Sequence, residues 1–303
     1  MKNATDIWQV GIVKRAIGDV LDDGLDNAEI IWLPEPGPFR FNADPFGLWH
    51  NGCLTVLVEA YDYRSKHGEI QYHTFDPDWN VTAQGVALRE PFHLSYPQLI
   101  RDGGHIYMLP EGHRSGKLTL YRAVRFPDIW LPVETLMEAP AIDASLAWHG
   151  GRWWMFHAVP GEDQRAMREL HVAYADSLSG PWAPHAGNPV REGLDSARPG
   201  GTPFSHKGAL YLPTQDCSRT YGGALNVLKI EELTPDRFRA SPARTFLPGV
   251  HAGYRDGLHT LSAAGDVTLI DVKKLDRSSR LWIDLERRWR RLTGRDWAGK
   301  DRA

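Results

Sequence analysis

Residues 142–159, IDASLAWHGGRWWMFHAV, contain the pattern that decides the fold. An apolar run leads into a tight turn that ends at Gly151, and a second apolar and aromatic run follows it. Glycine accepts the positive φ angles of a two-residue hairpin turn, and aromatic and β-branched side chains favour extended strands. The segment therefore predicts a β-hairpin.

The same pattern occurs five times along the chain, and its turn glycines stand at positions 52, 104, 151, 208 and 265. The other copies are residues 43–60 (ADPFGLWHNGCLTVLVEA), 95–112 (SYPQLIRDGGHIYMLPEG), 200–217 (GGTPFSHKGALYLPTQDC) and 256–274 (DGLHTLSAAGDVTLIDVKK). A recurrence of about 50 residues built from hairpins is the length of one four-stranded propeller blade. We therefore predict an all-β fold, a five-bladed β-propeller. The alternative is a β-sandwich with accidental spacing.

The predicted propeller covers residues 1–275 of the chain. Its blades run approximately over residues 41–90, 91–137, 138–190, 191–243 and 244–275. Residues 8–13, WQVGIV, form a plausible strand that could pair with the last blade and close the ring. Closure removes the exposed strand edges that otherwise promote aggregation.

Residues 276–303 are predicted to form a separate tail with a C-terminal basic helix at 281–297. Four apolar residues of this tail fall at helical spacing, namely Trp282, Leu285, Trp289 and Leu292, and arginines crowd the rest. Such a helix can contact an anionic membrane or a protein partner. The simpler expectation is that it packs its apolar stripe on its own domain.

The composition limits the function classes. A formal net charge of −3 argues against a protein whose main function is to bind the nucleic-acid backbone. The two cysteines, Cys53 and Cys217, form no disulfide framework, and charged residues interrupt any apolar export signal in the first twenty residues. We therefore expect a cytoplasmic protein, with a peripheral membrane location as an alternative. No metal-ligand spacing or phosphate loop is present. We expect no metal and no cofactor, while an axial Ca²⁺ and a nucleotide-sugar donor stay open.

In a propeller, the inner strands of all blades start at one central funnel, so polar residues at matching places in the repeats become neighbours. Asp44 and Asp143 open blades one and three, and Glu59 and Glu111 end the second strands of blades one and two. We expect the following residues to join them around the funnel: His93, Tyr96, Arg198, Gly200, Gly201, Gln215, Asp216, Tyr221, Arg255 and His259.

The matched carboxylates are the candidate catalytic groups. Asp44, directly before a proline, is either a turn-capping residue or a catalytic base or nucleophile, and its match with Asp143 favours function. Glu111 has apolar neighbours that could raise its pKa, as a general acid requires, although a strand-end Glu in a salt bridge is equally consistent. Glycosidic chemistry typically uses two such carboxylates.

Several motifs carry a resemblance to a known family. They are ADPF (43–46), HLSYP (93–97), YMLPEG (107–112), IDASL (142–146), ARPGGTPF (197–204) and LHTLSA (258–263). Together they resemble the propeller domain at the N-terminus of plant glucosamine inositolphosphorylceramide transferases and its free-standing bacterial relatives, over nearly the whole chain. More distantly, that domain is similar to five-bladed glycoside hydrolases of the arabinanase and xylosidase group.

The distant resemblance implies roles for the carboxylates. In those hydrolases an Asp early in blade one is the base, an Asp in blade three orients, and a Glu in blade four is the acid. Asp44 and Asp143 match the first two positions, but blade four reads Arg198-Pro-Gly-Gly201 with no Glu. The sequence departs from the hydrolase pattern at the acid, a place that Glu111 or Glu59 could take.

This departure favours a carbohydrate-active enzyme that transfers a sugar from a phosphate-activated donor. A phosphate leaving group needs cations and hydrogen-bond donors rather than a proton, and Arg198 with the amides of Gly200 and Gly201 would suit it. The resemblance to proteins that build glycans points the same way. The alternatives are a glycoside hydrolase and a non-catalytic glycan-binding module, and the sugar or nucleotide sugar is the expected ligand in each case.

Overall fold

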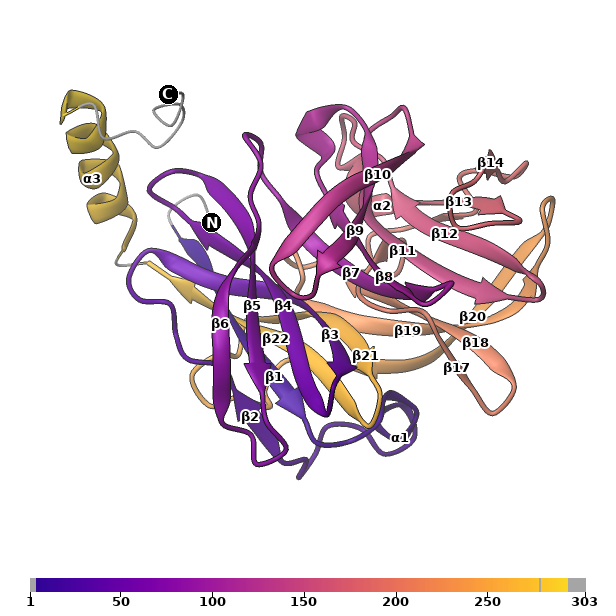
Figure 1. Cartoon of the computed structure of the whole chain (residues 1–303), viewed down its shortest axis with the longest axis horizontal. Helices are drawn as coiled ribbons and strands as arrows, with labels where there is room; N and C mark the ends of the chain where they lie inside the picture. Colours follow the sequence, from indigo (N-terminus) through magenta and orange to yellow (C-terminus); the bar gives the residue numbers. More distant parts are fainter. Residues whose placement is uncertain (1–3, 278, 294–303) are drawn as a thin grey trace.

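The apolar runs on either side of each turn glycine form antiparallel strand pairs, and these pairs extend into five sheets around one axis (Figure 1). The structure is a computed structural model that describes residues 4–277 and 279–293. Four of the sheets follow one another along the chain, and the fifth joins its two ends. The prediction of a five-bladed β-propeller is confirmed.

Blades one and two are simple four-stranded meanders. Blade one contains β3 (Arg40–His50), β4 (Cys53–Asp62), β5 (His67–Phe75) and β6 (Val81–Leu88). Blade two contains β7 (Ser95–Asp102), β8 (His105–Glu111), β9 (Leu118–Arg125) and β10 (Ile129–Met137), with a short 3₁₀ helix, η1 (His113–Ser115), after β8. The first-named strand of each blade lies innermost.

Blades three and four each have five strands. Blade three contains β11 (Ile142–His149), β12 (Arg152–Ala158), the short helix α2 (Arg165–Arg168), β13 (Glu169–Ala175), β14 (Ala183–Pro184) and β15 (Arg191–Glu192). Blade four contains β16 (Arg198–Pro199), β17 (Phe204–His206), β18 (Ala209–Asp216), β19 (Ala224–Leu233) and β20 (Phe238–Phe246). Its inner edge is divided between β16 and β17, which both pair with β18.

The fifth sheet combines the two ends of the chain. Its inner strands are β21 (Gly257–Ala264) and β22 (Val267–Asp276), and β1 (Thr5–Val13) pairs with β22 over its whole length. The outer strand is β2 (Ile30–Trp32). The segment 8–13, expected to close the ring, lies within β1.

Each pair of neighbouring blades encloses an apolar layer. Val56 of blade one, for example, packs with Val10 and Leu269 of blade five, and Met155 of blade three packs with Leu109 of blade two. Burial at about 25 cal/mol per Å² of apolar surface makes these layers the main stabilising contribution to the ring. They hold the blades at fixed angles, so residues at the inner strand starts keep fixed relative positions.

Four of the five inner strands are irregular at the same place. The pairing register breaks between Ala43 and Phe46 in blade one, and at the equivalent points in blades two, three and five. Within these bulges Asp44, Tyr96 and Asp143 have φ angles of 49°, 47° and 49°, in the left-handed region. A bulge re-aims a side chain out of the regular alternation. The sequence repeat therefore encodes a repeated bulge at the funnel as well as a hairpin.

Two helices differ from the sequence-based expectation. The helix α1 (Ile17–Asp23) was not predicted; it buries Ile17, Val20 and Leu21 in the layer between blades four and five. The C-terminal helix α3 spans Ser279–Thr293, so residues 294–297 of the predicted helix lie outside the described residues. No helix among the described residues combines the length and apolar character needed to span a bilayer.

Candidate functional site

The inner strand starts surround a funnel of about 230 Å³. The funnel brings together eight of the residues predicted from the sequence: Asp44, Glu59, His93, Glu111, Asp143, Arg198, Tyr221 and His259. The remaining lining residues were not predicted: Asp6, Trp8, Phe41, Tyr61, Tyr63 and Ser95. The funnel therefore combines five carboxyl groups with an aromatic wall, and flat aromatic faces of this kind can stack on sugar rings.

Asp44 is held by a buried histidine–aspartate pair from blade five. His259 Nδ1 donates a hydrogen bond of 2.7 Å to Asp271 Oδ1, and Nε2 of the same ring lies 3.6 Å from Asp44 Oδ1. The backbone N–H of Asp44 donates to Asp271 Oδ2 at 2.9 Å. The indole of Trp8 stacks on the His259 ring, with centroids 3.7 Å apart. These contacts fix the position of the Asp44 carboxyl.

The protonation state of Asp44 is set by this environment. Burial raises the pKa of Asp44 to about 6, although the neighbouring His259 opposes the rise. Asp271 is fully buried, but its contacts with His259 and the Asp44 amide keep its own pKa low. Asp44 is therefore a carboxylate poised to gain or lose a proton close to neutral pH.

Asp143 occupies the corresponding bulge in blade three and pairs with Arg198 of blade four. Arg198 Nε donates to Asp143 Oδ2 at 2.6 Å, and Gln215 Nε2 donates to the same oxygen at 2.8 Å. The guanidinium also lies over the Tyr221 ring, 5.1 Å from its centroid. Burial alone would lower the pKa of Arg198, but the Asp143 carboxylate raises it well above its ordinary value, so the guanidinium stays charged.

Glu59 and Glu111 have matching places but opposite electrostatics. Ala43 pairs with Glu59 and Ser95 with Glu111, each one residue before a left-handed position. Burial, together with the negative charge of Asp44, raises the pKa of Glu59 well above its ordinary value. The matching sequence position therefore does not give matching chemistry.

The expectation of a raised pKa for Glu111 was wrong. Burial would raise it, but a 2.6 Å hydrogen bond from His113 Nδ1 and the charge of Arg198 lower the pKa of Glu111 to about 2. Its other oxygen accepts a 3.1 Å hydrogen bond from the Asp143 N–H. Glu111 is therefore a positioning group that is charged at neutral pH, and Glu59 is the carboxyl whose pKa is raised by burial.

His93 positions Glu59. Its Nδ1 accepts a hydrogen bond of 2.9 Å from the Gly68 N–H, so the ring proton is on Nε2, which lies 3.4 Å from Glu59 Oε1. Burial lowers the pKa of His93 to about 4, so the ring is neutral at pH 7. A neutral imidazole N–H facing Glu59 leaves the other oxygen of that carboxyl to carry a proton.

The predicted anion site at the blade-four glycines does not exist. The N–H of Gly200 donates to Pro213 O at 2.9 Å, and the N–H of Gly201 donates to the hydroxyl of Tyr96. Tyr96 is itself 1% exposed and forms part of the floor beneath the funnel rather than its wall. Arg198 is thus the cation that remains available from the ARPGG motif.

Three other predicted residues lie behind or outside the funnel. Gln215 is buried behind the wall and acts by orienting Asp143. Asp216 Oδ1 accepts a hydrogen bond of 2.9 Å from the N–H of Ser218 in the turn after β18. Arg255 is exposed in the segment before β21 and does not line the funnel. Asp216, at the end of β18, and Arg255 therefore do not belong to the site.

Asp44, His259 and Asp271 also bring ligand-type atoms within 4.8 Å of one another, so the cluster can be tested as a cation site. Asp271 Oδ1 already accepts from His259 Nδ1 and from the N–H of Thr260 at 3.0 Å, and Oδ2 accepts from Asp44 N–H. A cation would have to displace these hydrogen bonds. The geometry fits a hydrogen-bonded triad better than a metal centre.

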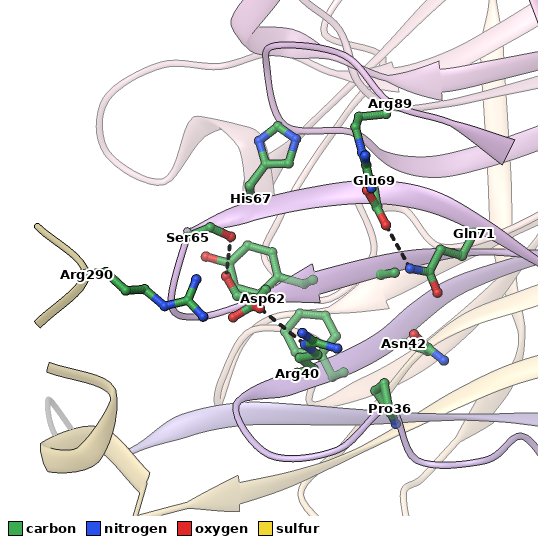
Figure 2. A pocket seen from close by; sticks show the side chains of 13 residues that line it. Pro36, Arg40, Asn42, Asp62, Ser65, His67, Glu69, Gln71, Arg89 and Arg290 are labelled. Atoms are coloured by element: carbon green, nitrogen blue, oxygen red, sulfur yellow. Dashed lines mark hydrogen bonds and ion pairs between the residues drawn. The ribbon is translucent and has the colours of Figure 1, made fainter. Parts of the chain in front are cut away.

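A second cavity of about 250 Å³ adjoins the funnel along the outer part of blade one and shares Phe41 and Tyr61 with it. Figure 2 shows Arg290 reaching toward this cavity from α3, opposite Arg40. Arg40 donates to Asp62 at 3.2 Å, and the other lining residues are mostly polar. The stacked rings of Phe41 and Tyr61, with centroids 5.0 Å apart, separate the two spaces.

Asp271 and Trp8 are the functional residues that sequence reasoning missed. Asp271 is a lone carboxylate in the apolar run VTLIDV of β22, and such a residue is a signal of a buried role. Trp8 lies in the closing strand, so its place in the funnel depends on the ring geometry and not on the repeat.

Comparison with known proteins gives a sequence match and a structural match. The family model "Glucosamine inositolphosphorylceramide transferase 1, N-terminal" matches residues 34–255. Glucosamine inositolphosphorylceramide transferase 1 of Oryza sativa subsp. indica is 37% identical over 68% of this chain and 28% of its own length. The Arabidopsis thaliana protein of the same name is 34% identical over 67% of this chain and 27% of its own length. The chain thus spans little more than a quarter of these relatives.

Among solved structures, the α-L-arabinofuranosidase PaAbf62A from Podospora anserina superposes with a TM-score of 0.59. The match covers 81% of this chain and 94% of that protein at 9% identity. At this identity the likeness establishes the shared propeller fold alone.

Proposed function

The chain belongs to the family of the N-terminal domain of glucosamine inositolphosphorylceramide transferase 1, and on that premise we propose that its funnel transfers a sugar from a phosphate-activated donor to an acceptor hydroxyl. The proposal rests on two features of the funnel. One is a carboxylate with the pKa of a general base, Asp44, and the other is the charged guanidinium of Arg198, which lines the same funnel.

Asp44 is the proposed base, and its pKa of about 6 is the observation that carries the proposal. A base works best when its pKa lies near the operating pH. In the reaction Asp44 takes the proton of the acceptor hydroxyl, and the acceptor oxygen forms a bond to the anomeric carbon. The His259–Asp271 pair holds the carboxylate in place while the proton arrives.

Arg198 is the proposed partner of the leaving phosphate. As the sugar–phosphate bond breaks, the electron pair stays on the phosphate oxygen, and a cation nearby stabilises it. The Nε–H of Arg198 is used by Asp143, and no hydrogen bond from its terminal amino groups to a described residue is present. Those groups can donate to an oxyanion in the two-pronged manner of a guanidinium.

Hydrolysis of a glycosidic bond is a second candidate, and Glu59 is the observation that favours it. A sugar leaving group needs a proton, and Glu59 has the raised pKa of a general acid. In that reaction Glu59 gives its proton to the glycosidic oxygen, and Asp44 removes a proton from the attacking water. The five carboxyl groups that line the funnel also favour a neutral sugar over a highly charged donor.

A binding and turnover panel separates these functions. Nucleotides, nucleotide sugars, sugar 1-phosphates and free oligosaccharides are screened for a rise in melting temperature, and the same donors and a set of aryl and alkyl glycosides are assayed for release. Transfer requires binding of a phosphate-bearing donor and loss of turnover in Asp44→Asn. If no phosphate-bearing compound shifts melting, the transfer proposal fails.

The variants Glu59→Gln and Asp44→Asn distinguish transfer, hydrolysis and simple glycan binding. Glu59→Gln leaves transfer from a phosphate donor within about tenfold of wild type, whereas hydrolysis of alkyl glycosides falls by at least about a hundredfold. Hydrolysis of nitrophenyl glycosides is less affected, because the nitrophenolate leaving group does not need a proton. Glycan binding without turnover, unchanged in Asp44→Asn, would instead identify a binding module.

A further inference from the structure

The helix α3 is attached to the propeller through one face. Ile283 is 1% exposed, and Arg287 Nε donates a hydrogen bond of 2.8 Å to the backbone oxygen of Tyr63 in blade one. Arg290, on the same face, lines the cavity beside the funnel (Figure 2). Residues 283, 287 and 290 fall together at helical spacing, so this face is the one turned toward blade one.

The opposite face carries the apolar stripe predicted from the sequence, and the stripe is exposed. Trp282, Leu285 and Leu292 are 64%, 50% and 79% exposed, and Trp289 is 47% exposed. The expectation that the stripe packs on its own domain was wrong. Ile283, Arg287 and Arg290 form the face that is turned toward blade one, and Figure 1 shows α3 at the periphery, outside all five sheets.

The helix also concentrates positive charge. Its fifteen residues, SRLWIDLERRWRRLT, contain five arginines and two acidic residues, whereas the whole chain has a formal net charge of −3. Arg288 is exposed next to the apolar stripe. Two tryptophans in an apolar stripe, with arginine beside it, are the pattern of helices that lie in the interface of an anionic bilayer.

We propose that α3 is a docking surface for an anionic lipid bilayer, with Trp282, Leu285 and Leu292 entering the interface and Arg288 contacting lipid phosphates. A tryptophan ring places its apolar body in the acyl region and its N–H among the headgroups. The long arginine side chain reaches headgroup phosphates from a helix that lies flat.

Self-association through the same stripe is disfavoured by its size. A helix of fifteen residues is about 22 Å long. If its apolar stripe is taken as about 10 Å wide, as for the diameter of a helix, two such stripes would bury on the order of 450 Å² in total, well below the roughly 1,200 Å² of a stable protein interface. A bilayer covers the stripe without requiring a complementary surface around it, and its charge complements the arginines.

Docking would also orient the funnel. Arg290 places α3 at the rim of the cavity that shares Phe41 and Tyr61 with the funnel, so a bound bilayer would lie next to that rim. The docking itself does not depend on the proposed transfer reaction.

The test is co-sedimentation of the full chain with vesicles of phosphatidylcholine alone and of phosphatidylcholine with one quarter phosphatidylglycerol. We expect binding to the anionic vesicles, a blue shift of tryptophan fluorescence, and weakening with salt. The double variant Trp282→Ala/Leu285→Ala should bind at least about tenfold more weakly, because it removes two apolar side chains that would be buried in the bilayer. Arg288→Glu should bind anionic vesicles at least about fivefold more weakly.

The matched control is Trp148→Ala, which removes a tryptophan that is 53% exposed on blade three. It should bind like wild type, and melting curves of all variants show whether the fold is intact. The proposal is overturned if the wild type does not sediment with anionic vesicles, or if the control loses binding as much as the double variant. A dimer in size-exclusion chromatography that the double variant dissociates would identify a second copy as the occupant instead.

Discussion

The backbone N–H of Asp143 donates a hydrogen bond to Oε2 of Glu111 at 3.1 Å, across the boundary between blades two and three. Asp143 has a left-handed backbone, with φ at 49°, and a non-glycine residue holds that conformation only where its surroundings enforce it. Blade five repeats the arrangement, because Asp271 accepts from the N–H of Asp44, whose φ is also 49°. In both places a carboxylate from the second strand of one blade fixes the bulge of the next.

The variant Glu111→Gln should therefore destabilise the fold. It removes the negative charge that His113 and Arg198 stabilise, and it weakens the hydrogen bond from the Asp143 amide. We expect a loss of about 2 kcal/mol in the free energy of unfolding. In a chain of this size that corresponds to a fall of roughly 3 °C in melting temperature, measured by circular dichroism. The exposed Glu138→Gln is the control and should change the melting temperature by less than about 1 °C.

The same variant has a defined pH dependence. Because the folded-state pKa of Glu111, about 2, lies below its ordinary value of 4.5, its contribution to stability is present above pH 4.5 and disappears as the pH falls toward 2. The gap between wild type and Glu111→Gln should close over that window. A gap that is constant from pH 7 to pH 3 would contradict the assigned charge state.

Asp44→Asn should abolish turnover and stabilise the protein. The pKa of Asp44 is raised from 3.8 to about 6, so its ionisation opposes folding, and the stability that its proton provides is lost as the pH rises from about 4 through 6. Asparagine is neutral throughout, and we expect a gain of about 3 kcal/mol at pH 7.5 and little change at pH 4. Chemical denaturation at the two pH values measures the gain, and an Asp44→Asn variant that is less stable at pH 7.5 would refute the argument.

The pH–rate profile distinguishes the two proposed reactions. Transfer with Asp44 as base should rise through about pH 6 and then level off, since a phosphate leaving group needs no acid. Hydrolysis should give a bell-shaped pH–rate profile, because activity also falls as Glu59 loses its proton at higher pH. The ascending limb should vanish in Asp44→Asn together with the activity. An activity that already levels off below pH 5 would exclude Asp44 as the base.

The sequence predicted the blades because their signal is local. A hairpin turn and two apolar strands leave a pattern every 50 residues or so, and that pattern also aligned Asp44 with Asp143 and Glu59 with Glu111. Because the blades form a ring, the sequence also predicted that these four carboxyl groups lie close together around the funnel. The direction of the Glu111 pKa shift did not follow, because it depends on the hydrogen bond from His113 and the charge of Arg198, and the repeat predicts which residues surround the funnel but not their individual contacts.

Two other misses have the same origin. The amides of Gly200 and Gly201 looked free in the sequence, but Pro213 and the Tyr96 hydroxyl occupy them from other parts of the ring. The stripe of α3 was expected to be buried, yet helical periodicity only shows that a helix has an apolar face and not which surface that face meets. Periodicity predicts elements, and contacts between distant residues decide their roles.

Arg198 has two proposed roles, and a pair of variants separates them. It holds the buried Asp143, and it is also proposed to bind the donor phosphate. Burial raises the pKa of Asp143 well above its ordinary value, and Arg198 opposes this rise. Arg198→Met alone leaves the buried Asp143 carboxyl without its cation, so we expect a loss of about 3 kcal/mol in stability and loss of donor binding. In the double variant Arg198→Met/Asp143→Asn no buried charge is left unpaired, and most of the stability should return. Donor binding, measured by calorimetry, should stay at least about tenfold weaker than wild type, because the guanidinium that binds the phosphate is still missing. If the double variant recovers donor binding along with stability, Arg198 acts only through Asp143, and the phosphate-binding role must be given up.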